Sequence, residues 1–106
     1  MKLDGVGPET PLPSSAAQMA RDYAKIAASL PEEMKKQWTD ADLKTVDDMY
    51  GEKWSRAQTL AILVSHQTHH RGQMSVLMRQ AGLKVPGVYG PAREEWAGFG
   101  MSSPEV

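Results

Sequence analysis

The sequence predicts an all-α protein: an antiparallel helical hairpin with main helices at about residues 15–30 and 55–81, and short helices beside them. Three observations support this fold class. Apolar residues recur at three- and four-residue steps in both segments, which is the period of an amphipathic helix. Alanine is abundant, seven residues are methionine, and β-branched residues are few outside the second segment. Glycine and proline are concentrated near the two ends of the chain.

With 106 residues, the chain has room for one domain, for which we expect irregular tails at 1–13 and 98–106. Twelve Lys and Arg balance 13 Asp and Glu, which argues against an electrostatic nucleic-acid binder. No apolar run is long enough to cross a membrane, and the N-terminal residues lack the pattern of a secretory signal. We therefore expect a cytoplasmic protein. Because cysteine is absent, any metal ligands must be His, Asp or Glu.

The first helix is predicted to begin at Ser14 or Ser15, either of which can cap it, and to end near Leu30. Pro31 suits the first turn of a new, short helix that reaches about Trp38. Residues 39–54 are polar and irregular, with Gly51 as the expected turn residue of a brief extended piece or hairpin.

The second main helix is predicted to start at Ser55, because Ser55 and Gln58 match the capping-box pattern. It continues to Ala81, and Gly82 is the expected left-handed terminator. Further along, Ala92 to Ala97 can form one more helical turn.

Both faces of this helix carry a recognisable pattern at 100° per residue. One stripe, which we call the histidine stripe, comprises Thr59, Leu63, His66, His70, Met74, Leu77 and Ala81. The opposite side holds the small residues Ala61, Ser65, Thr68, Gly72 and Ser75. Small residues in a row permit close approach of another backbone, but a solvent-exposed polar strip is an equal alternative.

His66 and His70 are four residues apart, so their rings project side by side from neighbouring turns. Imidazole suits zinc or nickel, and a helical pair of this spacing supplies two ligands of a divalent metal. The pair interrupts an otherwise apolar stripe, where two polar rings are costly without partners. Hydrogen bonds to backbone or hydroxyl groups are the alternative way to satisfy them.

Three neighbouring residues are further candidates. His69 and Gln73 lie beside the stripe and can add a ligand or support one, although a purely structural hydrogen bond is an alternative for His69. Arg71 can contact the carboxylate of a substrate, since its planar guanidinium suits that geometry, or it can simply be solvated.

The run from His66 to Gln73, H-Q-T-H-H-R-G-Q, followed by Leu77, Arg79, Gly82 and Pro86, resembles the C-terminal helix of the DinB-like proteins. The resemblance extends upstream through Leu30, Pro31 and Ser55 and covers about residues 15 to 90. That superfamily also contains thiol-dependent transferases, including bacillithiol transferases and a mycothiol-dependent isomerase.

The resemblance implies a helical bundle that holds a divalent metal with three histidines, two of which correspond to His66 and His70. In the family the third histidine lies on an earlier helix, whereas no histidine precedes His66 in this chain. The chain thus corresponds to the second half of the family fold. We expect two copies to form a homodimer that completes a four-helix bundle.

The missing ligand then comes from the partner chain, and His66 and His70 of both copies can even form one site of four histidines. The alternatives are a carboxylate such as Asp22, or water. Two kinds of function follow. One is a metal-dependent thiol transferase or hydrolase acting on a small molecule or thiol. The other is a non-catalytic metal-binding or structural dimer, or one half of a split bundle. The sequence leaves open whether the chain is an enzyme.

Overall fold

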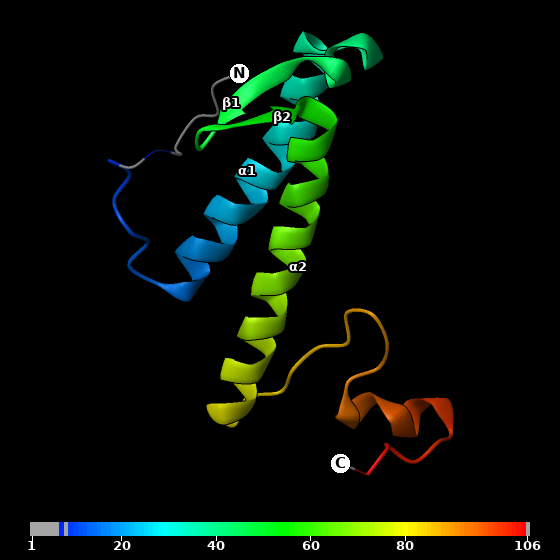
Figure 1. The fold of residues 1–106 in the computed structure, drawn as a ribbon. Coiled ribbons are helices and arrows are strands. Elements are labelled where there is room, and N and C mark those ends of the chain that lie inside the picture. The colour runs from blue at the N-terminus through cyan, green and yellow to red at the C-terminus, as the bar shows by residue number, and fades with distance from the viewer. Residues whose placement is uncertain (1–6, 8, 106) are drawn as a thin grey trace. The chain divides into compact units, whose positions relative to one another are not determined.

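The structure, a computed structural model, describes residues 7 and 9–105 of the chain. Its elements follow in the order α1 (Ala16–Gln37), η1 (Asp40–Lys44), β1 (Val46–Met49), β2 (Glu52–Ser55), α2 (Arg56–Gln80) and η2 (Arg93–Phe99), as Figure 1 shows. The fold is therefore mainly α, as expected, and it also contains one small two-stranded sheet. The chain divides into two compact units, Met1–Thr59 and Leu60–Val106, which we describe in turn.

Helix α1 begins where the capping pattern predicts. The hydroxyl of Ser15 accepts a hydrogen bond from the backbone N–H of Gln18 at 3.1 Å. The Gln18 side chain in turn accepts from the backbone N–H and the hydroxyl of Ser14. Both candidate serines thus contribute to this helix start.

The predicted break at Pro31 is wrong, because α1 continues through this residue to Gln37 and no separate short helix forms. The proline ring fixes a φ angle that a helix tolerates. Proline inside a helix is nevertheless unfavourable, because it removes one backbone hydrogen bond and its ring crowds the preceding turn. Ion pairs offset part of this cost in the next turn, where Lys35 contacts Glu32 at 3.0 Å and Lys36 contacts Glu33 at 2.8 Å.

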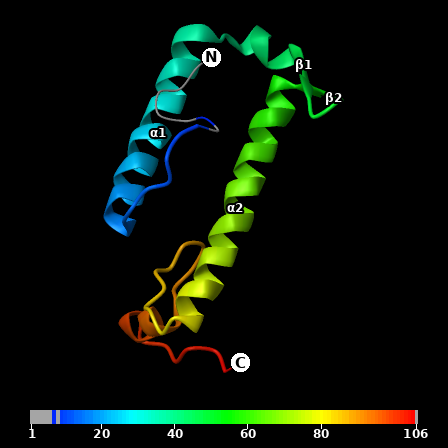
Figure 2. The ribbon, with the colours of Figure 1, turned by 90° about the vertical axis from the view of Figure 1, so that its left-hand side faces the viewer.

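The hairpin expected around Gly51 is present, and both ribbon views show its two strands side by side (Figures 1 and 2). The strands pair antiparallel with Val46 opposite Ser55 and Met49 opposite Glu52. The two turn residues, Tyr50 and Gly51, both have positive φ angles, of 58° and 86°. This is the signature of the two-residue turn whose twist matches that of paired strands.

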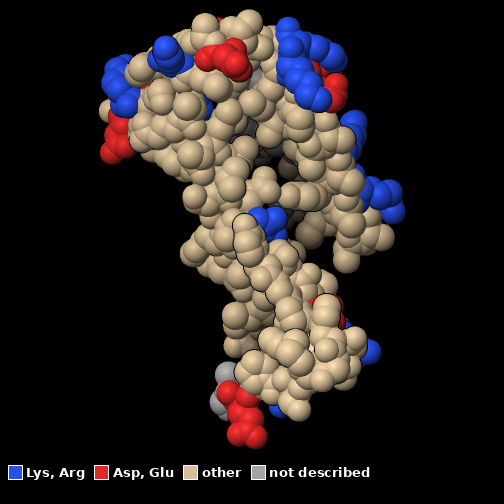
Figure 3. Space-filling model, turned by 90° about the vertical axis from the view of Figure 1, so that its right-hand side faces the viewer, with Lys and Arg blue, Asp and Glu red and all other residues tan. Residues whose placement is uncertain are grey.

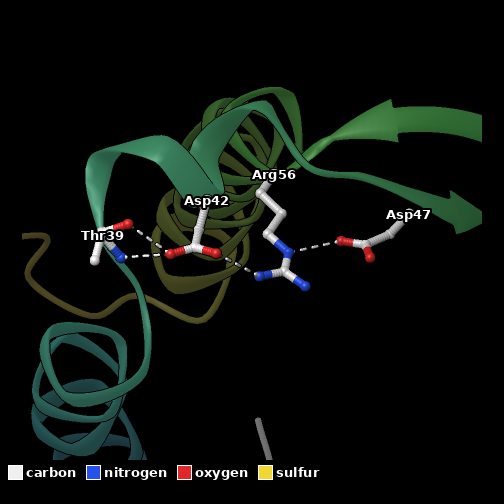
Figure 4. A network of polar contacts seen from close by, with 4 residues as sticks. All are labelled: Thr39, Asp42, Asp47 and Arg56. Atoms are coloured by element: carbon white, nitrogen blue, oxygen red, sulfur yellow. Dashed lines mark hydrogen bonds and ion pairs between the residues drawn. The ribbon is translucent and has the colours of Figure 1, made fainter.

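Arg56, the first residue of α2, lies in a cluster of polar contacts with the hairpin and η1 (Figure 4). Its Nε donates to Asp47 Oδ2 at 3.0 Å, and its Nη1 lies 4.0 Å from Asp42 Oδ1. Its guanidinium also stands 4.8 Å above the ring of Trp38. These contacts set the direction in which the chain enters α2.

The ends of α2 match the prediction to within one residue. Ser55 Oγ accepts from the backbone N–H of Gln58 at 3.1 Å, which is the expected N-cap contact. At the other end Gly82 has a φ of 72°, and its N–H donates to Arg79 O while Leu83 N–H donates to Met78 O. These paired bonds form the Schellman termination that glycine favours.

Beyond α2, η2 forms where one further helical turn is predicted, and it is tied to the end of α2. The guanidinium of Arg79 makes a two-pronged ion pair with the Glu94 carboxylate, with Nη2 2.9 Å from Oε2. Glu95 accepts from the backbone N–H groups of Ala92 and Gly87 at 2.9 and 3.1 Å. Of the expected tails, Met1 to Val6, Pro8 and Val106 lie outside the described residues, and Gly98 and Phe99 belong to η2.

Within the described part of the chain, no side chain of either unit is buried. The histidine stripe is a clear case, since Met74 is 56% exposed and Leu77 is 63% exposed. Each unit by itself therefore leaves this stripe uncovered. Among the described residues, no helix is both long and apolar enough to cross a membrane. The homodimer and the single-domain organisation stay predictions.

Candidate metal centre

The middle of α2 brings His66 and His70 together as their spacing predicts. Their Nε2 atoms are 2.8 Å apart, and their ring centroids are 4.5 Å apart with planes tilted by 47°. Both rings are exposed. The helix backbone alone produces this convergence, because residues four apart lie one above the other on consecutive turns.

Gln73 is the second contact of this centre. Its Oε1 lies 2.8 Å from Nδ1 of His70, so Gln73 contacts the ring nitrogen of His70 that does not contact His66. His70 is thus held at both nitrogens, by His66 on one side and by Gln73 on the other. Of the two roles considered for Gln73, support of a histidine is the one that matches this contact.

Two of the remaining candidates, His69 and Arg71, neighbour the pair on α2. The His69 ring stands edge-on to that of His70, with centroids 5.3 Å apart and planes at 71°. Arg71 reaches back to Thr68, whose hydroxyl accepts from its Nη2 at 3.3 Å. Asp22 lies on α1, in the other compact unit. The parts of the chain that the structure describes contain no group of three His, Asp or Glu residues that could hold a metal.

The His66–His70 pair nevertheless fits a divalent metal in donor type and in spacing. Two nitrogens bound to one tetrahedral zinc at about 2.0–2.1 Å are about 3.3 Å apart. The observed 2.8 Å between the Nε2 atoms is close to this value, so a small outward rotation of the rings is enough. Imidazole is also the ligand type that zinc and nickel accept. The described chain therefore offers half of a tetrahedral ligand set on one helix.

The surface around the pair is short of charge. Between Arg56 and Arg71 the helix has no Lys, Arg, Asp or Glu. In Figure 3 the largest groups of Lys, Arg, Asp and Glu lie in the upper part of the view, and uncharged atoms cover most of the middle of the face shown. This stretch of α2 therefore presents its imidazoles on a surface without charged side chains.

Sequence reasoning missed the polar cluster of Arg56 and its carboxylate partners, although part of its signal is present. Thr39 and Asp42 have capping-box spacing, and in the structure Thr39 donates to Asp42 Oδ2 from its backbone N–H and from its hydroxyl, each at 2.7 Å. These bonds lower the pKa of Asp42, with a smaller contribution from Arg56. Asp47 joins this cluster only through the strand register, which no local pattern predicts.

Comparison with known proteins assigns the chain. The model of the DinB family matches residues 8–105, and the chain belongs to this family. Uncharacterized protein YrdA of Bacillus subtilis (strain 168) is 47% identical over 96 residues, which are 91% of this chain and 58% of that protein. The crystal structure of a DinB-like protein from Bacillus cereus ATCC 10987 is similar with a TM-score of 0.76 and 46% identity, covering 83% of this chain and 59% of that one. The chain thus spans under two thirds of the length of these relatives.

Proposed function

We propose that this DinB family chain binds a divalent metal through Nε2 of His66 and Nε2 of His70, and that a second copy of the chain completes the site. The observation that carries the proposal is the 2.8 Å approach of the two Nε2 atoms, in a stretch of α2 (residues 57–70) that has no Lys, Arg, Asp or Glu. Zinc and nickel are the expected metals because both accept imidazole.

The need for a second copy rests on what one chain lacks. Among the described residues, no third His, Asp or Glu lies close enough to His66 and His70 to complete a metal-binding group. The apolar side chains of α2 are also not buried. A dimer that packs the histidine stripes of two α2 helices against each other covers those side chains and brings four imidazoles together. This is the arrangement of a four-helix bundle with ligands on facing helices.

Two roles, one catalytic and one structural, are compatible with such a centre. A bound divalent metal lowers the pKa of a thiol or a water and so supplies a nucleophile at neutral pH, which is the chemistry of a thiol transferase or hydrolase. A shared site of four histidines leaves no open position and is instead a structural centre. The absence of cysteine from the chain means that any thiol comes from the substrate.

Elemental analysis of the untagged protein tests the metal proposal. We expect one metal per chain or one per two chains, and loss of the metal in His66→Ala and in His70→Ala. His69→Ala is the matched control, because it removes an equally exposed imidazole one residue away and should retain the metal. Protein without metal after incubation with Zn²⁺ or Ni²⁺, or equal loss in all three variants, contradicts the proposal.

The ratio of metal to chain separates the possible ligand sets. One metal per two chains, unchanged in Asp22→Asn, favours a four-histidine centre, and assays of thiol transfer are then expected to be negative. One metal per chain that Asp22→Asn weakens favours a carboxylate ligand with an open position. A monomer by light scattering at micromolar concentration excludes the second copy.

A further inference from the structure

We propose that Gln73 is a positioning residue that fixes His70 in a single tautomer and thereby presents its Nε2 lone pair toward the metal. This inference rests on the proposed metal function and assigns a specific role to Gln73. It follows from the direction of one hydrogen bond.

The amide oxygen of Gln73 can only accept a hydrogen bond. Oε1 lies 2.8 Å from His70 Nδ1, and a hydrogen bond between these two atoms requires the proton to be on the ring nitrogen. A neutral imidazole has one protonated nitrogen, so Nε2 of His70 has a free lone pair. The lone pair points toward His66, whose Nε2 is 2.8 Å away.

The two histidines are consequently not equivalent. His66 must donate its Nε2–H to His70 in the metal-free chain, and it has to transfer this proton to Nδ1 before its own Nε2 can bind a metal. His70 needs no such change. Among the described contacts none reaches Nδ1 of His66, so His66 is free to exchange tautomers while His70 is fixed.

The surroundings of Gln73 support this role. Gln73 follows His70 by three residues, so one helical turn brings its amide to the ring. His69 stands edge-on to the same ring and limits its rotation. Arg71 bonds to Thr68 instead and does not compete for the Gln73 oxygen. Ligating histidines commonly donate their second N–H to an acceptor, and loss of that acceptor typically weakens metal binding about 10- to 100-fold.

The test compares Gln73→Leu, which removes the acceptor at similar volume, with Gln73→Glu, which keeps it. Gln80→Leu is the control for removing an exposed glutamine from the same helix. The tautomer of His70 is read from ¹⁵N–¹H NMR correlations of the imidazoles in the full, metal-free chain, in alkaline buffer where imidazole is neutral. Zn²⁺ affinity is measured by competition with a chelator.

We expect His70 in the parent, Gln73→Glu and Gln80→Leu to carry its proton on Nδ1, and His70 in Gln73→Leu to populate both tautomers. Zn²⁺ affinity should fall about 10- to 100-fold in Gln73→Leu only. A pure Nδ1–H tautomer in Gln73→Leu, or a Zn²⁺ affinity within twofold of the parent, overturns the role of Gln73. A parent chain that binds no Zn²⁺ overturns the proposed function instead, and the NMR result then still decides whether Gln73 fixes the tautomer.

Discussion

The two long helices of this protein differ in how their side chains are satisfied. α1 is amphipathic, with an apolar seam on one side and an exposed salt bridge, Lys35–Glu32, on the other. α2 has three arginines as its only charged residues and carries apolar side chains around its circumference, including Val64 and Leu77 on opposite sides. A helix of the first kind needs one covering surface, whereas a helix of the second kind needs cover on several sides. The comparison therefore supports α2, rather than α1, as the element that the proposed partner chain would cover.

The largest expected effect comes from placing a charge on the histidine stripe. Leu77 and Val64 are 63% and 65% exposed in the single chain, but only Leu77 lies on the stripe. If that stripe is the dimer interface, Leu77→Asp removes an apolar contact and buries a charge, which should weaken assembly by about 3 kcal/mol or more. Val64→Asp should weaken it less. Light scattering across a dilution series measures both, and equal behaviour of the two variants would count against the stripe as the interface.

A smaller effect, on the stability of the fold, is expected from a substitution where α2 begins. Arg56 contacts Asp47, Asp42 and Trp38 together, and its side chain is 25% exposed. Arg56→Met should lower the free energy of unfolding by about 1–2 kcal/mol. Lys53→Met, which removes the exposed ion pair with Asp48, should cost less than about 0.5 kcal/mol. Chemical denaturation compares the two, and a Lys53 effect as large as that of Arg56 would contradict a special role for this cluster.

Substitution by alanine at two glycines should change the free energy of unfolding in opposite directions. Gly51 has a φ of 86°, so Gly51→Ala strains the hairpin turn and should destabilise the protein by about 1 kcal/mol. Gly72 lies inside α2 with no atom within 4 Å of an added Cβ, and Gly72→Ala should stabilise the helix by about 0.8–1 kcal/mol. Thermal unfolding measures both changes. Destabilisation by Gly72→Ala would mean that the small-residue face packs closely against another backbone in the assembly.

The smallest effect is local and depends on pH. The ion pair with Arg79 lowers the pKa of Glu94 from its ordinary value of 4.5 to about 2. Because the folded-state pKa is depressed, the stabilising contribution is complete above about pH 4.5 and is lost as the pH falls toward 2. Arg79→Met should raise the pKa of Glu94 toward its ordinary value, because it removes the largest of the contributions that lower it.

Arg93→Met is the control for this titration, because Arg93 makes only the smallest of the contributions to the Glu94 shift. Carboxyl ¹³C NMR follows the titration of Glu94 directly. A similar pKa of Glu94 in both arginine variants would show that the ion pair at the end of α2 does not hold η2 in place.

The features that could be predicted from the sequence are those that depend on residues close together along the chain. Short-range signals were sufficient for the cap at Ser15, the turn at Gly51, the terminator at Gly82 and the approach of His66 to His70, since each depends on residues at most five apart. Pro31 failed as a terminator because its effect competes with the ion pairs of the next turn. The cluster of Arg56 with Asp47 depends on strand register, and a third ligand of the proposed metal would depend on contacts between chains. Neither leaves a periodic signal in the sequence.

The position of the histidines along α2 has a consequence for hydrogen exchange. The helix is about 37 Å long, its first residue is held by the contacts of Arg56, and its last turn is held by the Arg79–Glu94 pair and the Gly82 cap. Fraying starts at helix ends, so amides near the middle should open least often and exchange most slowly. The ring nitrogens of His66 and His70 are thus kept in register by the most persistent turns of the helix, so the proposed metal would require little further ordering of this helix.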